Sequence, residues 1–312
     1  MSLKRYQSIN WRYWLRLLGL FAFALAAALI LLPVLFGFLL TYGLLHAPCQ
    51  TNRQTPGDYG YAWEDVTLPA RAGGRFRGYF ISGSNGATIL IPPTLAQGRD
   101  GRLREAALLA EHEFAVFTFE ARPCAGMRPL SLGYQEVDEV ADALDYLLSR
   151  RDVDPERIGI YGFSSAGATA IMAAARLPTL RAVVAEGGYG DFAEGALGLN
   201  DEPEHLLLAY FWPLYGVSTR LTYRWVAGSD IDQLSPLDVI DQIAPRPILL
   251  IYGDQELSLI GGRQQQAAAG NNAELWVVPG AGHGTYLDAA PQEYERRLTT
   301  FFERVLLIAN SL

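Results

Sequence analysis

Ser164 is the residue of this chain whose surroundings best suit a nucleophile, within the run Gly162-Phe163-Ser164-Ser165-Ala166. A short apolar stretch precedes the run and an alanine-rich stretch follows it, which predicts a sharp turn from a strand into a helix. A nucleophile on such a turn needs small residues two positions before and two positions after it. Gly162 and Ala166 meet this requirement around Ser164, whereas Ser165 would have Phe163 two positions before it. The competing interpretation is a helix-capping turn without catalytic activity.

A serine nucleophile needs a base, and the chain has four histidines, His46, His112, His205 and His283. The first borders a long apolar segment, the second falls in a predicted helix, and the third lies in an aromatic-rich insertion. Only His283 lies on a glycine-rich loop after a predicted strand, where an open parallel sheet places its chemistry. His283 is therefore the expected base. The alternative is a loop histidine that only hydrogen-bonds the backbone.

The base in turn needs an acid that orients it, expected between the serine and the histidine in the chain. The strand predicted over 247–252 ends at Gly253, and two carboxylates follow it, Asp254 and Glu256. Both lie just beyond the carboxyl end of that strand. The residues by themselves leave both carboxylates as candidates.

Together these side chains predict acyl transfer, in which the serine attacks an ester, thioester or amide carbonyl. Neither Cys49 nor Cys124 lies in a zinc-binding pattern, and no metal or organic cofactor is expected. The two cysteines could form a disulfide outside the cytoplasm, and the sequence leaves this open. The net charge of −8 argues against a nucleic-acid partner.

The elements that must position these residues alternate between strands and helices from residue 87 onward. Strands are expected over 63–68, 75–81, 87–91, 115–119, 158–161, 182–185, 247–252 and 274–278, and helices over 103–113, 132–150, 166–176 and 293–308. This alternation predicts an α/β fold, with a mostly parallel sheet covered by helices on both faces. Residues 47–60 are expected to form a linker. The aromatic-rich residues 188–235 interrupt the rhythm and are expected to form an inserted helical cap.

Residues 17–45 contain no charged residue and predict a transmembrane helix. At ~1.5 Å per residue they would span about 43 Å, more than the ~30 Å hydrocarbon core of a bilayer. Pro33 is expected to kink or end this helix. Aromatic residues suited to the membrane interface flank it, at Trp11, Tyr13, Trp14 and Tyr42.

The competing interpretation of this segment is a cleaved signal peptide, whose apolar core usually has only ~7–15 residues. The basic residues Lys4, Arg5, Arg12 and Arg16 all precede the apolar run. They predict a cytoplasmic N-terminus and a catalytic domain on the other side of the membrane. We expect a cytoplasmic stub and anchor over 1–46 and a single catalytic domain over 47–312.

Over roughly residues 55–305 the chain resembles membrane-anchored α/β-hydrolase-fold proteins of bacteria, related to serine esterases, acyl-lipid hydrolases and peptidases. The segments that carry the resemblance are 61–66, 132–137, 152–159, 162–166, 180–185, 234–238, 244–247 and 279–283. Members of this group usually carry the acid three residues after the glycine at the strand end. The resemblance therefore favours Glu256 as the acid, with Asp254 as the alternative.

The resemblance also implies an oxyanion hole made by the backbone N–H groups of Thr94 and Ser165. Relatives usually have His-Gly after the third strand, where this chain has Pro92-Pro93, and proline has no N–H to donate. Thr94 follows the pair and keeps its N–H. A second departure lies in the loop 120–126, where Pro123 replaces a glycine after Arg122, and an altered loop shape is expected there.

The function expected from this reasoning is a membrane-anchored serine hydrolase with carboxylesterase or lipase-like activity. The aromatic insertion next to a bilayer favours an apolar acyl substrate, a small molecule or a lipid. One alternative is a serine peptidase of the prolyl-oligopeptidase type. Another is a hydrolase-fold protein with weak activity that serves as a membrane scaffold or binding protein, which the departure at Pro92-Pro93 motivates. The sequence leaves the substrate and the oligomeric state open.

Overall fold

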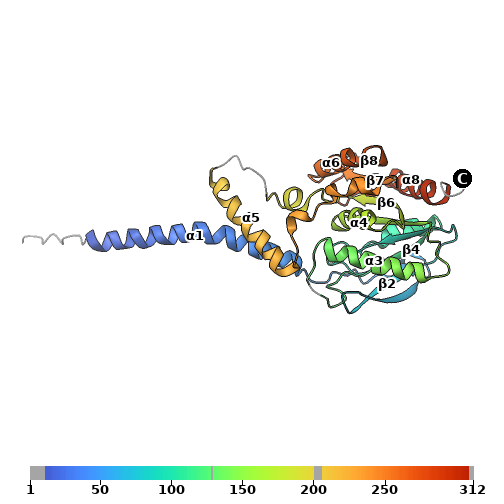
Figure 1. Ribbon diagram of the computed structural model, residues 1–312, viewed down its shortest axis with the longest axis horizontal. Coiled ribbons are helices and arrows are strands. Elements are labelled where there is room, and N and C mark those ends of the chain that lie inside the picture. Colours follow the sequence, from blue (N-terminus) through green and yellow to red (C-terminus); the bar gives the residue numbers. More distant parts are fainter. Residues whose placement is uncertain (1–10, 128, 200–205, 309–312) are drawn as a thin grey trace, which may run out of the picture.

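The computed structural model describes residues 11–127, 129–199 and 206–308, which are built around one eight-stranded sheet (Figure 1). The strand order is β1-β2-β4-β3-β5-β6-β7-β8, in which both pairings of β2 are antiparallel and the others are parallel. The strands are β1 (Glu64–Pro69), β2 (Arg75–Ile81), β3 (Thr88–Ile91), β4 (Ala115–Phe119), β5 (Ile158–Phe163), β6 (Leu180–Glu186), β7 (Ile248–Gly253) and β8 (Ala273–Val278). The mostly parallel sheet predicted from the alternation of elements is confirmed.

Helices cover both faces of this sheet, because successive strand side chains point to opposite faces and each face needs an apolar cover. In β3, for example, Leu90 joins the core under α3 and α4, whereas Ile89 and Ile91 join the core under α2 and α8. The helices are α1 (Trp11–Leu45), α2 (Leu103–Glu111), α3 (Tyr134–Ser149), α4 (Ser165–Arg176), α5 (Leu206–Ala227), α6 (Leu259–Ala269), α7 (Tyr286–Ala289) and α8 (Pro291–Phe302). A π-helical segment, Glu303–Ile308, continues α8.

Three helices differ from the sequence-based expectations, among them the four-residue helix α7, which follows His283 and was not predicted. Helix α6 was not predicted, because it buries only Gly262 and Gln265 and so has no apolar stripe. Helix α1 does not end at Pro33, which was one of the two outcomes expected there, and it continues to Leu45. Pro33 is buried at four-residue spacing with Gly37, Thr41 and Leu45. These residues form a buried stripe on one side of α1, and Gly37 within it packs against α5, which supports the helix beyond the proline.

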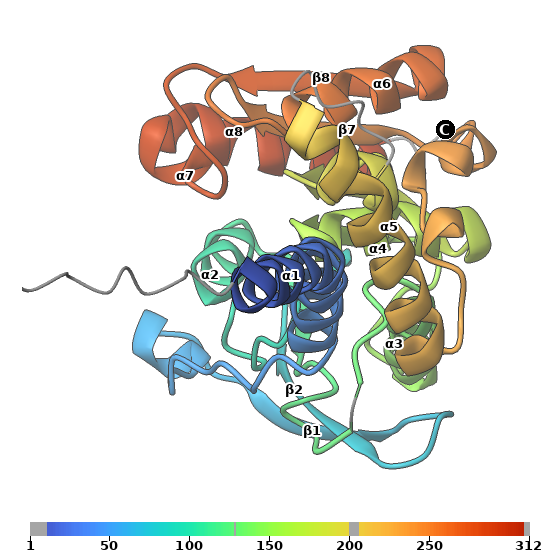
Figure 2. The same ribbon diagram turned by 90° about the vertical axis from the view of Figure 1, so that its left-hand side faces the viewer.

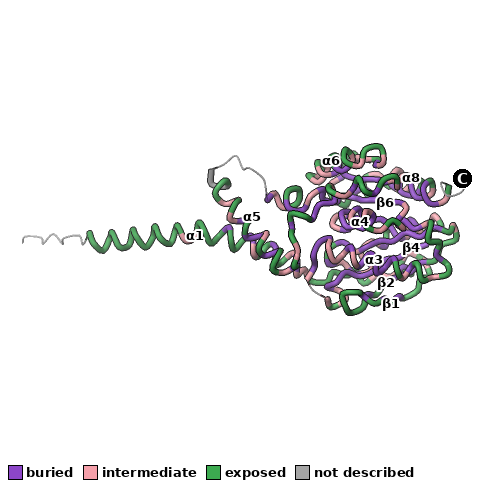
Figure 3. Tube along the Cα trace, viewed as in Figure 1, coloured by how far each residue is buried: buried purple, intermediate pink, exposed green. Residues whose placement is uncertain are grey.

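Helix α5 lies within 188–235, the segment expected to form a cap, and packs along the second half of α1 (Figures 1 and 2). The first half of α1 extends away from the sheet with its side chains exposed (Figure 3). Among the described residues, α1 is the one helix long and apolar enough to cross a membrane, a property that it shares with signal sequences. This helix and the part of the protein that contains the sheet thus meet where α1 ends.

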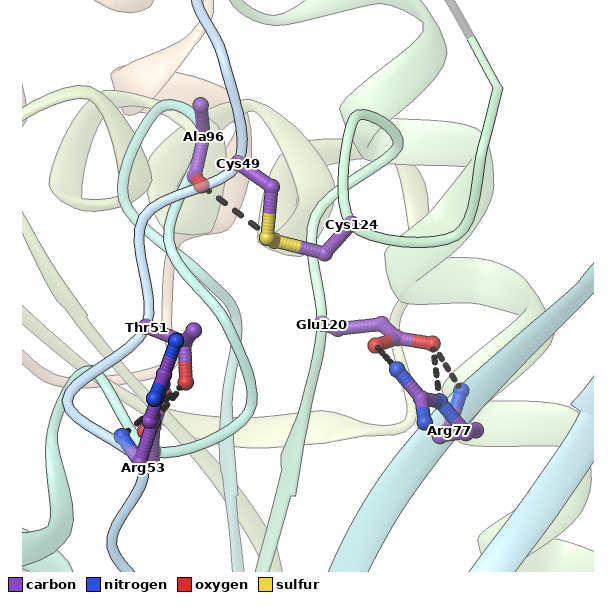
Figure 4. Close-up of a disulfide and its surroundings, with 8 residues drawn as sticks. Cys49, Thr51, Arg53, Arg77, Ala96, Glu120 and Cys124 are labelled. Atoms are coloured by element: carbon purple, nitrogen blue, oxygen red, sulfur yellow. Dashed lines mark hydrogen bonds and ion pairs between the residues drawn. A yellow bond between two sulfur atoms is a disulfide. The ribbon is translucent and has the colours of Figure 1, made fainter.

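The segment after α1, expected to be a linker, is tied to the body of the protein (Figure 4). Cys49 forms a disulfide with Cys124 of the loop after β4, with the two Cα atoms 4.7 Å apart. Gln50 and Gln97 form an isolated parallel β-bridge through their backbones, and Thr51 Oγ1 donates a hydrogen bond to Asp100 Oδ2 at 2.7 Å. The disulfide that the sequence left open is therefore present, and it fixes the end of α1 relative to the sheet.

Candidate active site

Ser164 lies at the tight turn between β5 and α4, with φ 55° and ψ −124°. This left-handed conformation is strained for a residue with a side chain, and it is typical of a nucleophile on a strand-to-helix turn. The turn depends on Gly162, because a Cβ at that position would lie 2.1 Å from the Ala166 carbonyl oxygen. The Ser164 N–H donates to the Glu186 carbonyl oxygen at 2.7 Å, which ties the turn to β6.

His283 and Glu256 lie beside Ser164, although the three residues come from three separate loops at the carboxyl ends of β5, β7 and β8. His283 Nε2 lies 3.1 Å from Ser164 Oγ, and His283 Nδ1 lies 2.8 Å from Glu256 Oε2. A hydroxyl, an imidazole and a carboxylate are thus joined by hydrogen bonds in the order that acyl transfer would require. The structure brings together the three residues that the sequence singled out for this chemistry.

The Glu256 carboxylate accepts four hydrogen bonds, and of their donors only His283 was expected from the sequence. Oε2 accepts from His283 Nδ1 and from Ser258 Oγ at 2.6 Å, and Oε1 accepts from the Gly253 N–H at 2.5 Å and the Tyr286 hydroxyl at 2.8 Å. Burial alone would raise the pKa of Glu256, but these hydrogen bonds outweigh it and hold the pKa below its ordinary value. The carboxylate is therefore kept ionised and fixed in orientation.

Asp254, the alternative acid, has a different partner. Its Oδ1 accepts a hydrogen bond from the Gly280 N–H at 2.9 Å, so it braces the loop that carries His283. The other described histidines also lie elsewhere: His46 stacks on Tyr42 in α1, and His112 Nε2 lies 2.9 Å from Glu295. His205 lies outside the described residues.

The loop after β3, which carries Pro92-Pro93, is attached to the turn around Ser164 by two hydrogen bonds. Thr94 Oγ1 donates to the Phe163 carbonyl oxygen at 2.8 Å, and the Leu95 N–H donates to Ser165 Oγ at 3.0 Å. Among the described residues, no protein acceptor pairs with the N–H of Thr94 or of Ser165. These two donors remain the expected oxyanion hole. The two side-chain bonds, which the sequence did not reveal, hold the donors next to the nucleophile.

The loop 120–126, in which Pro123 follows Arg122, is held by contacts of Arg122 and Cys124. Arg122 is buried, and its guanidinium donates to Glu139 at 2.8 Å and to the Pro129 carbonyl oxygen at 3.1 Å. The disulfide at Cys124 adds a covalent link. This loop therefore keeps a fixed shape without contributing a side chain to the triad.

A buried carboxylate, Glu186, lies at the end of β6 behind the nucleophile. Its Oε2 accepts from the Tyr161 hydroxyl at 2.8 Å, and its Oε1 accepts from the Tyr294 hydroxyl at 2.5 Å. Burial, with the charge of Glu105 nearby, raises the pKa of Glu186 to about 8 in spite of these hydrogen bonds. Glu186 is therefore largely protonated at neutral pH.

This raised pKa predicts a loss of stability at alkaline pH. Folding favours the protonated form, so the contribution of Glu186 is complete below its ordinary pKa of 4.5 and is lost as the pH rises through about 8. A tenfold change in proton affinity corresponds to about 1.4 kcal/mol. The side chain of Glu186→Gln cannot ionise. The melting temperature of this variant, measured by circular dichroism, should therefore rise relative to that of the wild type as the pH increases from 5 to 9. The exposed variant Glu111→Gln should follow the wild type, and a Glu186→Gln curve parallel to the wild type would contradict the prediction.

A pocket of about 800 Å³ opens over Ser164 and His283. Apolar side chains from several parts of the chain line it, including Leu44, Leu95, Tyr189, Phe192, Leu257 and Ile260. Leu44 belongs to α1, so the last turn of that helix borders the pocket. The pocket can therefore hold an apolar group next to the nucleophile.

Comparisons with known proteins agree with this geometry. The model of the prolyl oligopeptidase family matches residues 129–308. The YfhR protein of Escherichia coli K12 is 27% identical over 252 residues, covering 76% of this chain and 80% of YfhR. The PA2218 protein of Pseudomonas aeruginosa is 24% identical over 272 residues, covering 69% of this chain and 73% of PA2218.

Solved structures share the fold. The esterase Pf2001 of Pyrococcus furiosus superposes with a TM-score of 0.65 at 19% identity, covering 83% of this chain and 98% of the esterase. The crystal structure of PA2218 superposes with a TM-score of 0.60 at 21% identity, covering 79% of this chain and 94% of that protein. The family match spans more than half of the sequence and includes Ser164, Glu256 and His283. The chain is therefore a hydrolase with the α/β-hydrolase fold that belongs to the prolyl oligopeptidase family.

Proposed function

We propose that this protein is a serine hydrolase that cleaves carboxylic esters through an acyl-enzyme formed on Ser164. The observation that carries the proposal is the continuous hydrogen-bonded chain from Ser164 through His283 to Glu256. His283 Nε2 takes the Ser164 proton as Oγ attacks the ester carbonyl, while Glu256 keeps the proton on Nδ1 and stabilises the imidazolium. The imidazolium then gives its proton to the leaving alcohol. Water, activated by the same imidazole, releases the acid.

The negative oxygen that develops on the carbonyl needs donors that are already in place. In this proposal the N–H groups of Thr94 and Ser165 supply them. The hydrogen bonds from Thr94 Oγ1 and to Ser165 Oγ support this role, because they hold the loop against the nucleophile turn. The mechanism uses no metal or organic cofactor.

The substrate that we propose carries an apolar acyl group, because the pocket over Ser164 is lined by leucine and aromatic side chains. The similarity to the Pf2001 esterase is one of fold and is compatible with this choice. A serine peptidase is the second candidate, and the family description favours it. It would use the same triad on an amide carbonyl.

We place the catalytic domain outside the cytoplasm, with α1 as a retained single-pass anchor. The basic residues Lys4, Arg5, Arg12 and Arg16 lie before the apolar run, which supports a cytoplasmic N-terminus. The disulfide between Cys49 and Cys124 supports an oxidising compartment for the domain. The packing of α5 on α1 favours retention of α1 over its cleavage as a signal sequence.

Labelling with a fluorophosphonate probe tests the proposed nucleophile. The purified full chain in detergent should be labelled, Ser164→Ala should lose the label completely, and the α3 variant Ser149→Ala should keep it. Labelling that does not depend on Ser164 would overturn the proposal. A matched ester and anilide with the same acyl group then separate the two candidates: we expect hydrolysis of the ester and none of the anilide, and steady hydrolysis of the anilide would select the peptidase.

A further inference from the structure

Helix α1 carries two clusters of aromatic side chains at a separation that matches a bilayer. The first consists of Trp11, Tyr13 and Trp14. The second contains Phe38 and Tyr42, whose rings stack 5.6 Å apart. The stretch 15–37 between them rises about 35 Å at ~1.5 Å per residue, enough to cross a hydrocarbon core of ~30 Å. Tryptophan and tyrosine side chains gather at both interfaces of a membrane, so Tyr42 marks the interface next to the hydrolase domain.

Helix α5 contributes a side chain to this second cluster. The Trp225 ring stacks 6.3 Å from the Tyr42 ring and 6.5 Å from the Phe38 ring. The C-terminal end of α5 therefore lies at the same depth as the interfacial aromatics of α1.

The contact between the two helices is close and specific. A Cβ on Gly37 would lie 2.7 Å from the Tyr215 carbonyl oxygen, so the backbones approach each other closely there. Ser218 Oγ donates to the Val34 carbonyl oxygen at 2.6 Å. The Phe36 ring lies 5.6 Å from the Tyr215 ring. Small residues and polar side chains at a close contact are typical of helix pairs in membranes.

The side of α5 that faces away from the protein is largely apolar, although the exposed Arg224 shares it near the C-terminal end of the helix. Tyr210, Val217, Leu221 and Trp225 are all exposed, and Trp225 reaches 71% exposure. Their spacing of seven, four and four residues places them on one face of the helix. A contiguous exposed apolar surface of this kind is unusual for a protein in water. Because this face is continuous with the exposed surface of α1, the same bilayer can cover both.

The pocket over Ser164 opens at this level. Leu44, which lines it, follows Tyr42 by two residues and so lies only about 3 Å farther along α1. Leu257 and Ile260 on the pocket lining are 90% and 66% exposed. The Leu130 N–H donates to the Leu45 carbonyl oxygen at 2.8 Å, and together with the Cys49–Cys124 disulfide it holds the pocket in a fixed position relative to α1.

We propose that α5 lies in the membrane interface beside α1, with Val217, Leu221 and Trp225 in contact with lipid, so that the pocket takes acyl lipids directly from that leaflet. The substrate part of this inference rests on the proposed ester hydrolase, whereas the position of α5 does not. In this arrangement both α1 and α5 contact the bilayer. The acyl chain of a lipid reaches Ser164 without crossing water.

Fluorescence quenching tests the position of α5 without reference to activity. The full chain is placed in phospholipid vesicles with or without bromine atoms on the acyl chains, and the emission of Trp225 is obtained by subtracting Trp225→Phe from the wild type. We expect brominated lipid to remove at least about half of this emission. Trp63→Phe gives the matched control, because Trp63 lies next to β1. The emission of Trp63, obtained by subtracting this variant from the wild type, should be the same in both lipids. Equal Trp225 emission in the two lipids would overturn the inference.

A second measurement tests lipid delivery. The combined variant Val217→Ser, Leu221→Ser, Trp225→Ser should lose about tenfold in rate on a long-chain ester held in vesicles and keep its rate on a soluble short-chain ester. Leu148→Ser, an exposed change on α3, should alter neither rate. Equal losses on both substrates, or no loss on the vesicle ester, would overturn the inference. A wild type inactive on both esters would contradict the proposed function instead, and the quenching result would then decide the position of α5 alone.

Discussion

Glu256→Gln should lower kcat on a soluble ester by roughly 10³–10⁴-fold, by the same loss of the correct tautomer that disables other serine triads. The backbone N–H of Gly253 donates to Oε1, and its position is fixed because Gly253 belongs to β7. A glutamine must therefore place its carbonyl oxygen at that position and its NH₂ group toward His283 Nδ1. The imidazole would then carry its proton on Nε2 and could not accept the proton of Ser164. Steady-state kinetics with the purified full chain measure the loss.

Asp254→Asn is the matched control for this prediction. Within the part of the chain that the structure describes, its carboxylate accepts one hydrogen bond, from the Gly280 N–H, and an asparagine oxygen can accept the same bond. We expect kcat within about threefold of the wild type, because a loop hydrogen bond is kept and the imidazole is untouched. A larger loss with Asp254→Asn than with Glu256→Gln would move the acid to Asp254. Ser258→Ala, which removes one of the four donors to Glu256, should fall between the two.

Removal of the disulfide should produce the largest change in stability. Cys49 and Cys124 are separated by 75 residues, and closing a loop of that length restricts the unfolded chain by about 4 kcal/mol. The double variant Cys49→Ser, Cys124→Ser should therefore melt about 10 °C lower than the wild type, because a domain of this size loses ~2–4 °C per kcal/mol. Near-ultraviolet circular dichroism of the full chain in detergent measures the transition.

A reducing agent provides the control for this experiment. It should lower the melting temperature of the wild type toward that of the double variant and leave the double variant unchanged. A wild type insensitive to reduction, together with a double variant that melts like it, would show that the native contacts around Gln50 and Thr51 hold the segment without the covalent link.

Most of the sheet could be predicted from the sequence, because its strands are short apolar runs separated by turn residues and its main helices have an apolar stripe. Helix α6 could not, since it buries only Gly262 and Gln265 and has no periodic signal. The continuation of α1 through Pro33 also depended on packing. The buried stripe that includes Pro33 and Gly37 can support the helix beyond the proline only when α5 packs beside it.

The candidate site divides in the same way between sequence and tertiary structure. Local sequence was sufficient to single out Ser164 and His283, because the turn needs small neighbours and the loop follows a strand. Local sequence did not decide between Glu256 and Asp254 as the acid, because both follow β7. The structure shows that Glu256 contacts His283, whereas Asp254 contacts the Gly280 N–H. The donors Tyr286 and Ser258 had no signal in the sequence.

The sequence by itself determined the alternation of strands and helices, the long apolar helix near the N-terminus and the turn that presents Ser164. These features depend on the types and spacing of neighbouring residues, which local sterics and hydrophobic periodicity translate directly into structure. Only the tertiary structure decided that Glu256 faces His283, that Cys49 meets Cys124, and that α5 lies against α1. Each of these is a contact between segments far apart in the chain, and it forms only when the whole sheet has brought their ends together.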